Sequence, residues 1–270
     1  MIKLVLSDLD GTLLPYGRTE MTDRLLGQIM RLKEKGIIFC PASGRTLHSF
    51  QKLFKDKFKE CYFISENGSV VFDGQGNLLG KTAMPREVAL KLSHDFWNET
   101  DGLGEVLISG ERTSYLLCRE TTIEQRNGNY TMEERLLSNG NNCVKINKPE
   151  DVEEDIIKVS VFVAAGIAPY VERFAHRYGN IEPAVAGPYW LDTTLADKAT
   201  GVEILSKHLG ISPDEMVAFG DNYNDVAMLD AVGMPFIMSS AAKELLDRYP
   251  NHTNNPEDII EEIIMGQLMV

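Results

Sequence analysis

The chain has 270 residues, 43% of them hydrophobic, which allows one large domain or two smaller ones with a buried core. Its formal net charge of -13 disfavours nucleic acid and anionic membrane as partners, because both are bound by basic surfaces. No run approaches the ~20 apolar residues of a membrane span, and the apolar start at 2–6 is too short for a signal peptide. Four separated cysteines without a C-x-x-C pair favour free thiols, so we expect a cytoplasmic protein.

Short apolar segments alternate with amphipathic segments over the first 65 residues. The pattern predicts strands at 2–6, 37–40 and 61–65, and helices at 22–35 and about 47–55. Such an alternation of strands and helices is typical of a parallel sheet with right-handed crossovers. The N-terminal part is therefore expected to be α/β, with a doubly wound parallel sheet.

The pattern changes after residue 69. Two apolar runs that flank 74–77 predict a hairpin, and Pro85 is expected in the first turn of a helix that reaches about Thr100. Further strands are predicted at 105–109, 114–118 and 158–164, separated by helical or loop stretches near 123–138 and 169–178. Strands with interspersed helices indicate an α+β insert, not a continuation of the parallel sheet.

The alternation of strands and helices returns after about residue 187. The remaining predicted elements are a helix at 198–208, a strand at 216–219, a helix at 224–231, a strand at 235–238, and helices at 241–248 and 256–264. The simplest account is one parallel-sheet core domain made of 1–82 and 188–270, with an inserted α+β domain at 83–187.

Polar clusters lie where strands of the core are expected to end. Asp8 and Asp10 follow the first strand, 43–45 (Ser-Gly-Arg) follow the second, and 220–225 (Gly-Asp-Asn-Tyr-Asn-Asp) follow a later one. Lys198 instead begins a helix, at the point where the chain re-enters the core. Open parallel sheets bind their ligands in the crevice outside the carboxyl ends of the strands. We therefore expect these clusters to converge there.

The residue types in these clusters fit phosphoryl transfer. Four carboxylates in a small space repel one another unless a cation is bound, and oxygen-rich sites favour Mg²⁺, which also binds phosphate oxygens. One carboxylate can attack phosphorus, and a second, two residues away, can protonate the leaving oxygen and then activate water. Lys198, the Ser43 hydroxyl and backbone N–H groups can hold the equatorial phosphate oxygens. The four carboxylates are Asp8, Asp10, Asp221 and Asp225.

The order of the clusters resembles that of a known family. D-L-D-G-T at 8–12, S-G-R at 43–45, the lone Lys198 and G-D-N-Y-N-D at 220–225 are similar to the four motifs of the haloacid dehalogenase (HAD) superfamily. The large insert resembles that of the Cof-type, or class IIB, sugar phosphatases, in which a mobile cap lies over a Rossmann-like core. The resemblance spans the whole chain. It implies a Mg²⁺-dependent phosphatase that acts on small phosphorylated metabolites, with sugar phosphates as expected substrates.

The resemblance also implies a role for each motif residue. Asp8 is expected to be the nucleophile and a metal ligand, and Asp10 the general acid and base, which binds Mg²⁺ through its backbone carbonyl. Asp221 is expected to ligate the metal, and Asp225 to steady the water shell of the metal. The expected phosphate contacts are the Leu9 backbone amide, Ser43, Gly44, Lys198 and Asn224.

Two positions depart from the pattern of the family, and other questions stay open. Ala199 follows Lys198 where the group often has glycine, and 238–241 read Met-Ser-Ser-Ala in place of Met-Gly-Asn-Ala, but neither change removes a group that the chemistry needs. Arg45 and Asn67 are interpreted equally well as substrate contacts or as structural residues. A phosphotransferase or mutase, and a non-catalytic sensor of phosphorylated ligands, are alternative functions. A monomer or weak homo-oligomer is expected.

Overall fold

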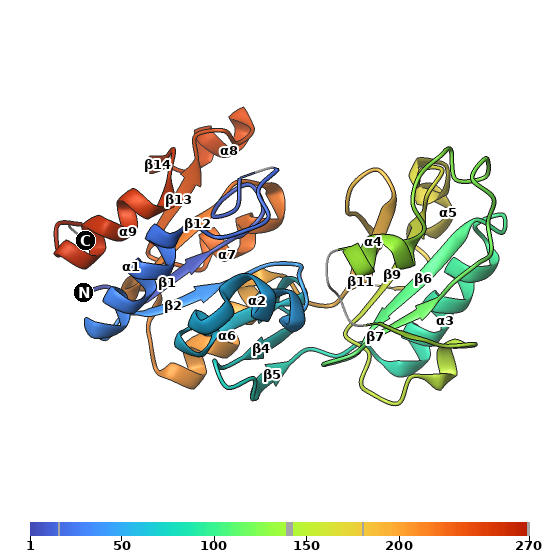
Figure 1. Ribbon diagram of the computed structural model, residues 1–270, viewed down its shortest axis with the longest axis horizontal. Helices are drawn as coiled ribbons and strands as arrows, with labels where there is room; N and C mark the ends of the chain where they lie inside the picture. Colours follow the sequence, from blue (N-terminus) through green and yellow to red (C-terminus); the bar gives the residue numbers. More distant parts are fainter. Residues whose placement is uncertain (16, 139–142, 180, 269–270) are drawn as a thin grey trace. The chain divides into compact units, whose positions relative to one another are not determined.

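The chain divides into two compact units (Figure 1). Unit 1 consists of Met1–Lys81 and Ala196–Val270, and unit 2 of Thr82–Leu195. The computed structural model describes residues 1–15, 17–138, 143–179 and 181–268. Each unit has a hydrophobic core of its own, so each is described by itself. Within the described ranges, no helix is both long enough and apolar enough to cross a membrane.

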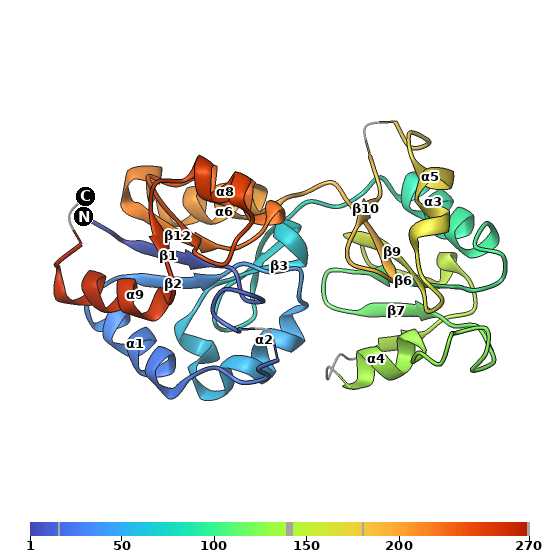
Figure 2. The same cartoon turned by 90° about the horizontal axis from the view of Figure 1, so that it is seen from above.

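A five-stranded parallel sheet forms the centre of unit 1. Its strands are β1 Leu4–Ser7, β2 Ile38–Pro41, β12 Met216–Gly220, β13 Met234–Met238 and β14 His252–Thr253. The strand order is β14-β13-β12-β1-β2, so β1 lies between β12 and β2. Every residue of β1 and β12 is buried, and helices cover both faces of the sheet (Figure 2), as parallel sheets require. The expected doubly wound parallel core is confirmed.

Side-chain caps fix where two helices of unit 1 begin. The helices are α1 Asp23–Glu34, α2 Leu47–Phe54, α6 Lys198–Leu209, α7 Val226–Asp230, α8 Lys243–Arg248 and α9 Pro256–Met265, with 3₁₀ turns η1 Lys55–Glu60, η2 Glu66–Gly68, η5 Pro213–Glu215 and η6 Tyr223–Asp225. Thr22 Oγ1 accepts a hydrogen bond from Leu25 N–H at the start of α1. The Asp197 carboxylate accepts one from Thr200 N–H at the start of α6. This second cap makes Lys198 the first residue of α6.

A three-stranded antiparallel sheet borders β2. It consists of β3 Phe63–Ser65, β4 Val70–Phe72 and β5 Leu78–Lys81, and the pairing of β4 with β5 confirms the predicted hairpin. The strand predicted at 61–65 meets β2 in parallel only through isolated bridges, Phe39 with Cys61 and Ala42 with Ile64. It therefore borders the main sheet without forming a full ladder with it.

Unit 2 is built on a six-stranded mixed sheet with the order β10-β11-β9-β6-β7-β8. Its elements are α3 Arg86–Asn98, β6 Gly104–Ser109, β7 Ser114–Leu117, α4 Met132–Ser138, β8 Cys143–Lys145, η3 Pro149–Asp151, β9 Lys158–Val163, η4 Ala168–Tyr170, α5 Val171–Phe174, β10 Ala184–Val185 and β11 Trp190–Thr194. Figure 2 shows α3 and α5 on one side of this sheet and α4 on the other. Phe96 and Phe174 pack in the larger core on the first side, and Met132 and Leu136 in a smaller cluster on the second. The unit is α+β in architecture.

The limits of the two units differ in detail from the expected domain limits. The first expected limit, after residue 82, lies next to the observed division after Lys81. The second was expected after residue 187, whereas unit 2 continues to Leu195, because β11 pairs along its whole length with β9. The sequence did not indicate β8, β10, β11 or β14. β8, β10 and β14 have only two or three residues, β11 lacks an apolar run, and each of the four pairs with a longer neighbour.

Candidate active site

Asp8 lies at the carboxyl end of β1, the strand between β12 and β2 in the parallel sheet of unit 1. It directly follows β1, and its backbone N–H donates to the carbonyl of Phe219 in β12 at 2.9 Å. The Asp8 side chain is 7% exposed, and its Oδ1 accepts a hydrogen bond from Lys198 Nζ. The first residue of α6 therefore reaches the residue that follows β1, as expected of convergent strand ends.

Lys198 connects two buried carboxylates. Its ammonium also donates to Asp225 Oδ1 at 2.5 Å, and both side chains are 1% exposed. The second oxygen of Asp225 accepts hydrogen bonds from the N–H groups of Asp221 and Asn222 at 2.9 and 3.0 Å. Both oxygens of Asp225 are thus engaged within the protein. This arrangement suits a residue that positions Lys198 and the loop after β12 better than it suits a direct metal ligand.

Asp221 is placed by close contacts with the loop after β1. Thr12 Oγ1 donates to Asp221 Oδ1 at 3.3 Å. Gly11 has a φ of 96°, and a Cβ at this position would lie 2.2 Å from Asp221 Oδ2. Gly68 plays a comparable part in placing α6, because a Cβ there would lie 1.8 Å from the carbonyl oxygen of Asp197. Larger residues at either glycine would displace the site.

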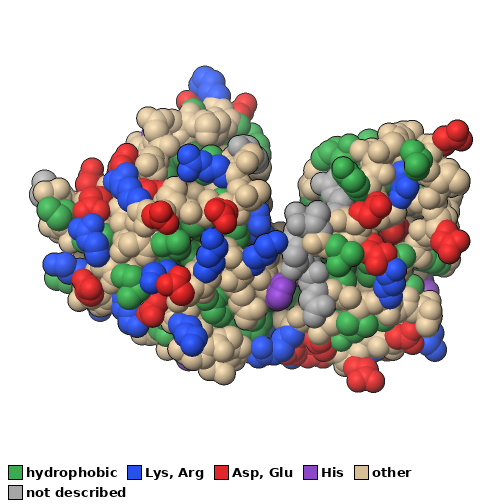
Figure 3. All heavy atoms as spheres, in the orientation of Figure 1, with side chains coloured by type: hydrophobic (Ala, Val, Ile, Leu, Met, Phe, Trp, Pro, Cys, Tyr) green, Lys and Arg blue, Asp and Glu red, His purple; other side chains and the backbone are tan. Residues whose placement is uncertain are grey.

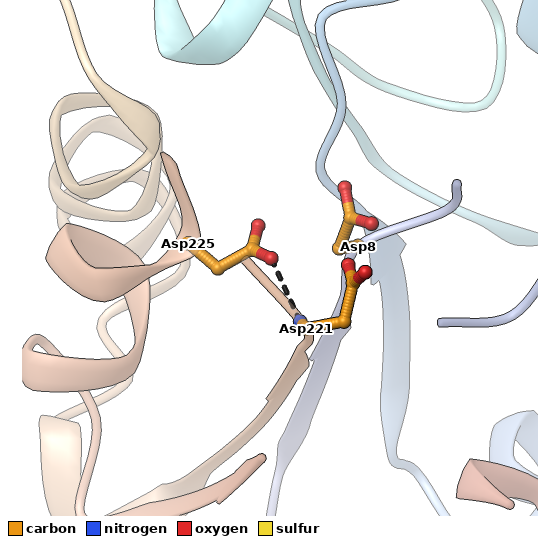
Figure 4. Close-up of side chains that lie close together, drawn as sticks. All are labelled: Asp8, Asp221 and Asp225. Carbon is orange, nitrogen blue, oxygen red and sulfur yellow. Dashed lines mark hydrogen bonds between the residues drawn. The ribbon is translucent and has the colours of Figure 1, made fainter. Parts of the chain in front are cut away.

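Figure 4 shows three carboxylates that lie close together. Asp8, Asp221 and Asp225 each offer an oxygen, and these oxygens lie within 4.8 Å of one another. Burial raises the pKa of Asp8 to about 7; the Lys198 ammonium opposes this shift, and the charges of Asp225 and Asp221 add to it. One ammonium therefore leaves the cluster with excess negative charge. The oxygens of Asp8 and Asp221 fit a divalent cation such as Mg²⁺ as direct ligands, and the charge of Asp225 beside them adds to the attraction.

Asp10 contacts a different cation. Arg45 donates to both oxygens of its carboxylate, from Nε to Oδ2 at 2.8 Å and from Nη2 to Oδ1 at 2.6 Å. Hydrogen bonding to Asp10 raises the pKa of Arg45. Arg45 is held in turn, because its Nη1 donates to Ser49 Oγ at 3.3 Å and its carbonyl accepts from Ser65 Oγ at 2.6 Å. The sequence left the role of Arg45 open, because no spacing rule connects Arg45 with Asp10, which lies 35 residues earlier.

The loop after β2 packs against η2. Ser43 is buried, its Oγ accepts from Arg45 N–H at 3.3 Å, and its carbonyl accepts from Asn67 N–H at 3.0 Å. A Cβ on Gly44 would lie 3.1 Å from the amide nitrogen of the Asn67 side chain. The buried Asn67 Oδ1 has no hydrogen-bond partner among the residues that the structure describes. Asn67 is therefore a further polar group beside Ser43, and the sequence had left its role open.

Four of the predicted phosphate contacts, which are Leu9, Ser43, Gly44 and Asn224, have no side-chain bond to the carboxylate cluster in the described parts of the chain. Leu9 is buried, and its carbonyl accepts from Thr12 and Leu14 N–H. Gly44 can offer only its backbone, and the Asn224 side chain is exposed within η6. Phosphate contacts by all five residues, Ser43 and Lys198 included, stay predictions.

Comparison with known proteins agrees with this geometry. The family described as haloacid dehalogenase-like hydrolase matches residues 5–261. An HMP-PP phosphatase of Serratia proteamaculans (strain 568) is 26% identical over 254 residues, which cover 93% of this chain and 88% of the relative. The 5-amino-6-(5-phospho-D-ribitylamino)uracil phosphatase YbjI of Escherichia coli (strain K12) is 27% identical over 269 residues, which cover 97% and 95%.

A solved structure shows the same fold. A sugar phosphatase of HAD subclass IIB matches this chain with a TM-score of 0.74 at 20% identity, over 98% of this chain and 100% of the other. Both units therefore have counterparts in that structure. The motifs at 8–12, 43–45, 198 and 220–225 predicted this kinship. The chain belongs to the haloacid dehalogenase-like hydrolases, and it is a phosphatase of their Cof-type group.

Proposed function

We propose that this phosphatase is Mg²⁺-dependent and hydrolyses phosphate monoesters of small metabolites through a covalent phosphate on Asp8. The observation that carries the proposal is the buried chain of contacts from Asp8 through Lys198 to Asp225, with Asp221 beside it. Lys198 holds Asp8 by Oδ1, whereas Oδ2 accepts no hydrogen bond from any described residue. This second oxygen is therefore available to attack phosphorus.

The reaction would proceed by two displacements at phosphorus. In the first, the Asp8 carboxylate forms a bond to phosphorus, the bond from phosphorus to the ester oxygen breaks, and Asp10 gives that oxygen a proton. In the second, Asp10 removes a proton from water as the water oxygen bonds to phosphorus, and inorganic phosphate leaves Asp8 free. Bound Mg²⁺ would neutralise and orient the phosphate oxygens. Asp8, Asp221 and the carbonyl of Asp10 would hold it, and Asp225 would act through Lys198 and the loop after β12.

The ion pair between Arg45 and Asp10 affects the proton transfer. Both oxygens of Asp10 accept hydrogen bonds from Arg45. Each oxygen keeps a second lone pair that can hold the proton that the leaving group needs, but a protonated oxygen accepts a hydrogen bond from the guanidinium more weakly than a carboxylate oxygen does. We therefore expect at least one of the two bonds to open when a substrate binds, so Arg45 orients Asp10 before the reaction and releases it during the reaction.

The substrate is proposed to be a small phosphorylated metabolite, and sugar phosphates belong to this class. The two relatives named above act on different metabolites by their names, so only the shared class is extended to this chain. Figure 3 shows acidic and basic side chains interspersed over the visible surface, which favours a small ligand over a polyanion such as nucleic acid. We propose that unit 2, which includes the insert at 83–187, serves as a mobile cap that limits water during attack and then lets the product leave.

An assay with phenyl phosphate tests the proposal. The protein should release phosphate only when Mg²⁺ is present, and EDTA should abolish the reaction. Asp8→Asn should lower kcat on the order of a thousandfold or more. Asp56→Asn is the matched control, because Asp56 is an exposed aspartate of unit 1 beside Lys57, and its kcat should be unchanged. Equal rates for Asp8→Asn and the control would overturn the assignment of Asp8.

A further inference from the structure

The backbone of η2, residues Glu66–Gly68, is strained. Glu66, Asn67 and Gly68 have positive φ angles of 51°, 54° and 99°. Left-handed backbone is unfavourable for residues that carry a side chain, although asparagine tolerates it better than most, and such residues rarely occur in succession. Strain of this kind persists only where the surrounding structure fixes it, and it is concentrated at functional sites. The contacts of η2 therefore indicate what the strained backbone does.

One set of contacts joins η2 to the loop after β2. Asn67 N–H donates to the carbonyl of Ser43 at 3.0 Å, and Glu66 N–H donates to the carbonyl of Arg45 at 3.2 Å. The Ser65 hydroxyl also donates to the Arg45 carbonyl, at 2.6 Å. The residues on either side of Gly44 are thus both held by their carbonyl groups, which fixes the position of Gly44.

These contacts orient the N–H group of Gly44. The carbonyl and N–H groups of a trans peptide point in opposite directions, so the bond from Asn67 to the Ser43 carbonyl turns the Gly44 N–H away from η2. β2 has β3, which precedes η2, on one side and β1 on the other. The Gly44 N–H therefore points toward the side on which Asp8 follows β1. It donates to no residue that the structure describes, so it is available to a phosphate oxygen.

Other contacts join η2 to the start of α6. A Cβ on Gly68 would lie 1.8 Å from the carbonyl oxygen of Asp197 and 3.1 Å from Cα of Lys198, and a Cβ on Gly201 would lie 3.1 Å from Cα of Gly68. Glycine at both positions lets η2 pack directly against the first turn of α6, whose first residue is Lys198. One short segment thus touches both the loop after β2 and the helix that carries the buried lysine.

The side chain of Asn67 has a smaller part in these contacts. Its amide packs over Gly44, where a Cβ would lie 3.1 Å from Nδ2. Neither Nδ2 nor the buried Oδ1 has a hydrogen-bond partner within the described ranges of the chain, whereas the backbone N–H donates to Ser43. The left-handed conformation of Asn67, which glycine adopts readily, is therefore the property on which the loop depends.

We propose that Asn67 is a positioning residue of the phosphate site. Its left-handed backbone holds the Gly44 N–H in place for a phosphate oxygen, and the packing of η2 on α6 fixes this donor relative to Lys198. The inference rests on the proposed function in one respect, because it takes Gly44 as a phosphate contact. A direct hydrogen bond from the Asn67 amide to phosphate is the competing explanation.

Two replacements of Asn67 separate these explanations. Asn67→Gly keeps the left-handed backbone and removes the amide, whereas the branched side chain in Asn67→Val opposes a positive φ. With Mg²⁺ present, Asn67→Val should raise the Kd for inorganic phosphate and lower kcat/KM for phenyl phosphate about tenfold each, because a hydrogen bond to a charged oxygen is lost. Asn67→Gly should stay within about threefold of the unchanged protein in both measurements. Equal weakening in the two variants would overturn the inference in favour of a direct bond from the amide.

Asn127→Val is the matched control. Asn127 and Gly128 repeat the Asn-Gly pair in unit 2, with positive φ angles of 52° and 75°, and Asn127 is exposed. Asn127→Val should therefore introduce similar backbone strain and lower the melting temperature, but leave phosphate affinity unchanged. If Asn67→Val binds phosphate as tightly as Asn127→Val at a temperature at which both are folded, Asn67 is only structural and the inference is wrong.

A binding measurement separates this inference from the proposed function. In an Asp8→Asn background, calorimetry measures the binding of inorganic phosphate without turnover. If the protein with Asp8 intact releases no phosphate from phenyl phosphate, but Asn67→Val alone weakens phosphate binding in this background, the positioning role is sustained without the reaction. If phosphate release depends on Asp8, but Asn67→Val binds inorganic phosphate as the unchanged protein does, the reaction is sustained and the inference is overturned.

Discussion

Arg45 and Asp10 form a two-pronged ion pair, with Arg45 Nε 2.8 Å from Asp10 Oδ2 and Nη2 2.6 Å from Oδ1. The two residues come from the loops after β2 and β1, so the pair connects neighbouring strand ends of the parallel sheet. A guanidinium presents its donors in a rigid plane and can hold both carboxylate oxygens at once, which an ammonium cannot. The pair therefore fixes the orientation of Asp10, although the Asp10 side chain is 48% exposed.

Replacing Arg45 by lysine keeps the positive charge but removes the planar pair of donors that binds both oxygens of Asp10. We expect Arg45→Lys to lower kcat for phenyl phosphate about tenfold, because a misoriented Asp10 transfers its proton less efficiently. The melting temperature should change little, since partly exposed ion pairs contribute about 1 kcal/mol or less. Steady-state kinetics and a thermal melt would check both statements.

Arg18→Lys is the matched control for Arg45→Lys. Arg18 is an exposed arginine in the loop between β1 and α1. Its replacement should leave kcat unchanged. If Arg45→Lys retains kcat within about twofold of the control, Arg45 does not orient Asp10, and its contact in the structure has no catalytic consequence.

Lys198 stabilises the site as well as the reaction. Lys198→Met would leave the buried carboxylates of Asp8 and Asp225 without their shared cation, and removing one partner of a buried ion pair costs about 3–5 kcal/mol. We expect loss of activity and a melting temperature lower by about 6 °C or more. Mg²⁺ should raise the melting temperature of the variant more than that of the unchanged protein, because the metal replaces part of the missing positive charge.

Lys207→Met provides the comparison on the same helix. Lys207 is 74% exposed and pairs with Glu203, so its loss should alter neither the melting temperature nor the activity. Similar melting temperatures for Lys198→Met and Lys207→Met would contradict the assignment of a stabilising role to Lys198.

The pKa of Asp8 predicts how Mg²⁺ affinity depends on pH. Burial raises this pKa to about 7 in the metal-free protein, and only the carboxylate form binds a cation. Below pH 7 each Mg²⁺ must displace a proton, so its dissociation constant should rise about tenfold per pH unit, and above pH 7 it should level off. Calorimetric titrations at pH 6, 7 and 8 would measure this. The profile should be flat in Asp8→Asn, and an equally steep profile in that variant would assign the proton to another group.

The sequence was sufficient to predict which residues lie at the ends of the strands, but not which side chains contact one another there. Asp8 and the loop after β12 were expected at one edge of the sheet because apolar runs precede both, and parallel strands end together. The engagement of both Asp225 oxygens was not foreseen. It depends on the approach of Lys198 and of two backbone N–H groups, which only the folded chain brings together.

The sequence did not indicate β11, or which residues of β6 and β9 face the same side of the sheet, for a related reason. β11 contains Asp192 and two threonines, so it lacks the apolar run by which strands were recognised, and its pairing with β9 is what makes it a strand. Ser109 and Ser160 are 51 residues apart, and no spacing indicates that they face the same side of a sheet. Register is a property of the assembled sheet, and local pattern specifies it only weakly in polar strands.

Glu105 offers a test of unit 2 that is independent of catalysis. It is buried on β6, one of its oxygens accepts from Met132 N–H at the start of α4, and burial raises its pKa. The folded state therefore binds the proton more tightly than the unfolded state does, and Glu105 makes the protein less stable as pH rises through its pKa. Glu105→Gln removes this titration but keeps an oxygen for Met132. The melting temperature of the variant minus that of the unchanged protein should therefore increase as pH rises from 4 to 8.

Glu134→Gln should show the opposite sign. Glu134 lies on α4 and accepts hydrogen bonds from Thr131 N–H and Oγ1, which lower its pKa, so its charged form contributes stability that is lost as pH falls. The melting temperature of Glu134→Gln minus that of the unchanged protein should therefore decrease as pH rises over the same range. Thermal melts of the three proteins at pH 4, 6 and 8 give the two differences directly. The two residues both contact α4, but Glu105 is buried and Glu134 is exposed. If the two differences in melting temperature changed with pH in the same direction, burial would not be what controls the ionisation of Glu105.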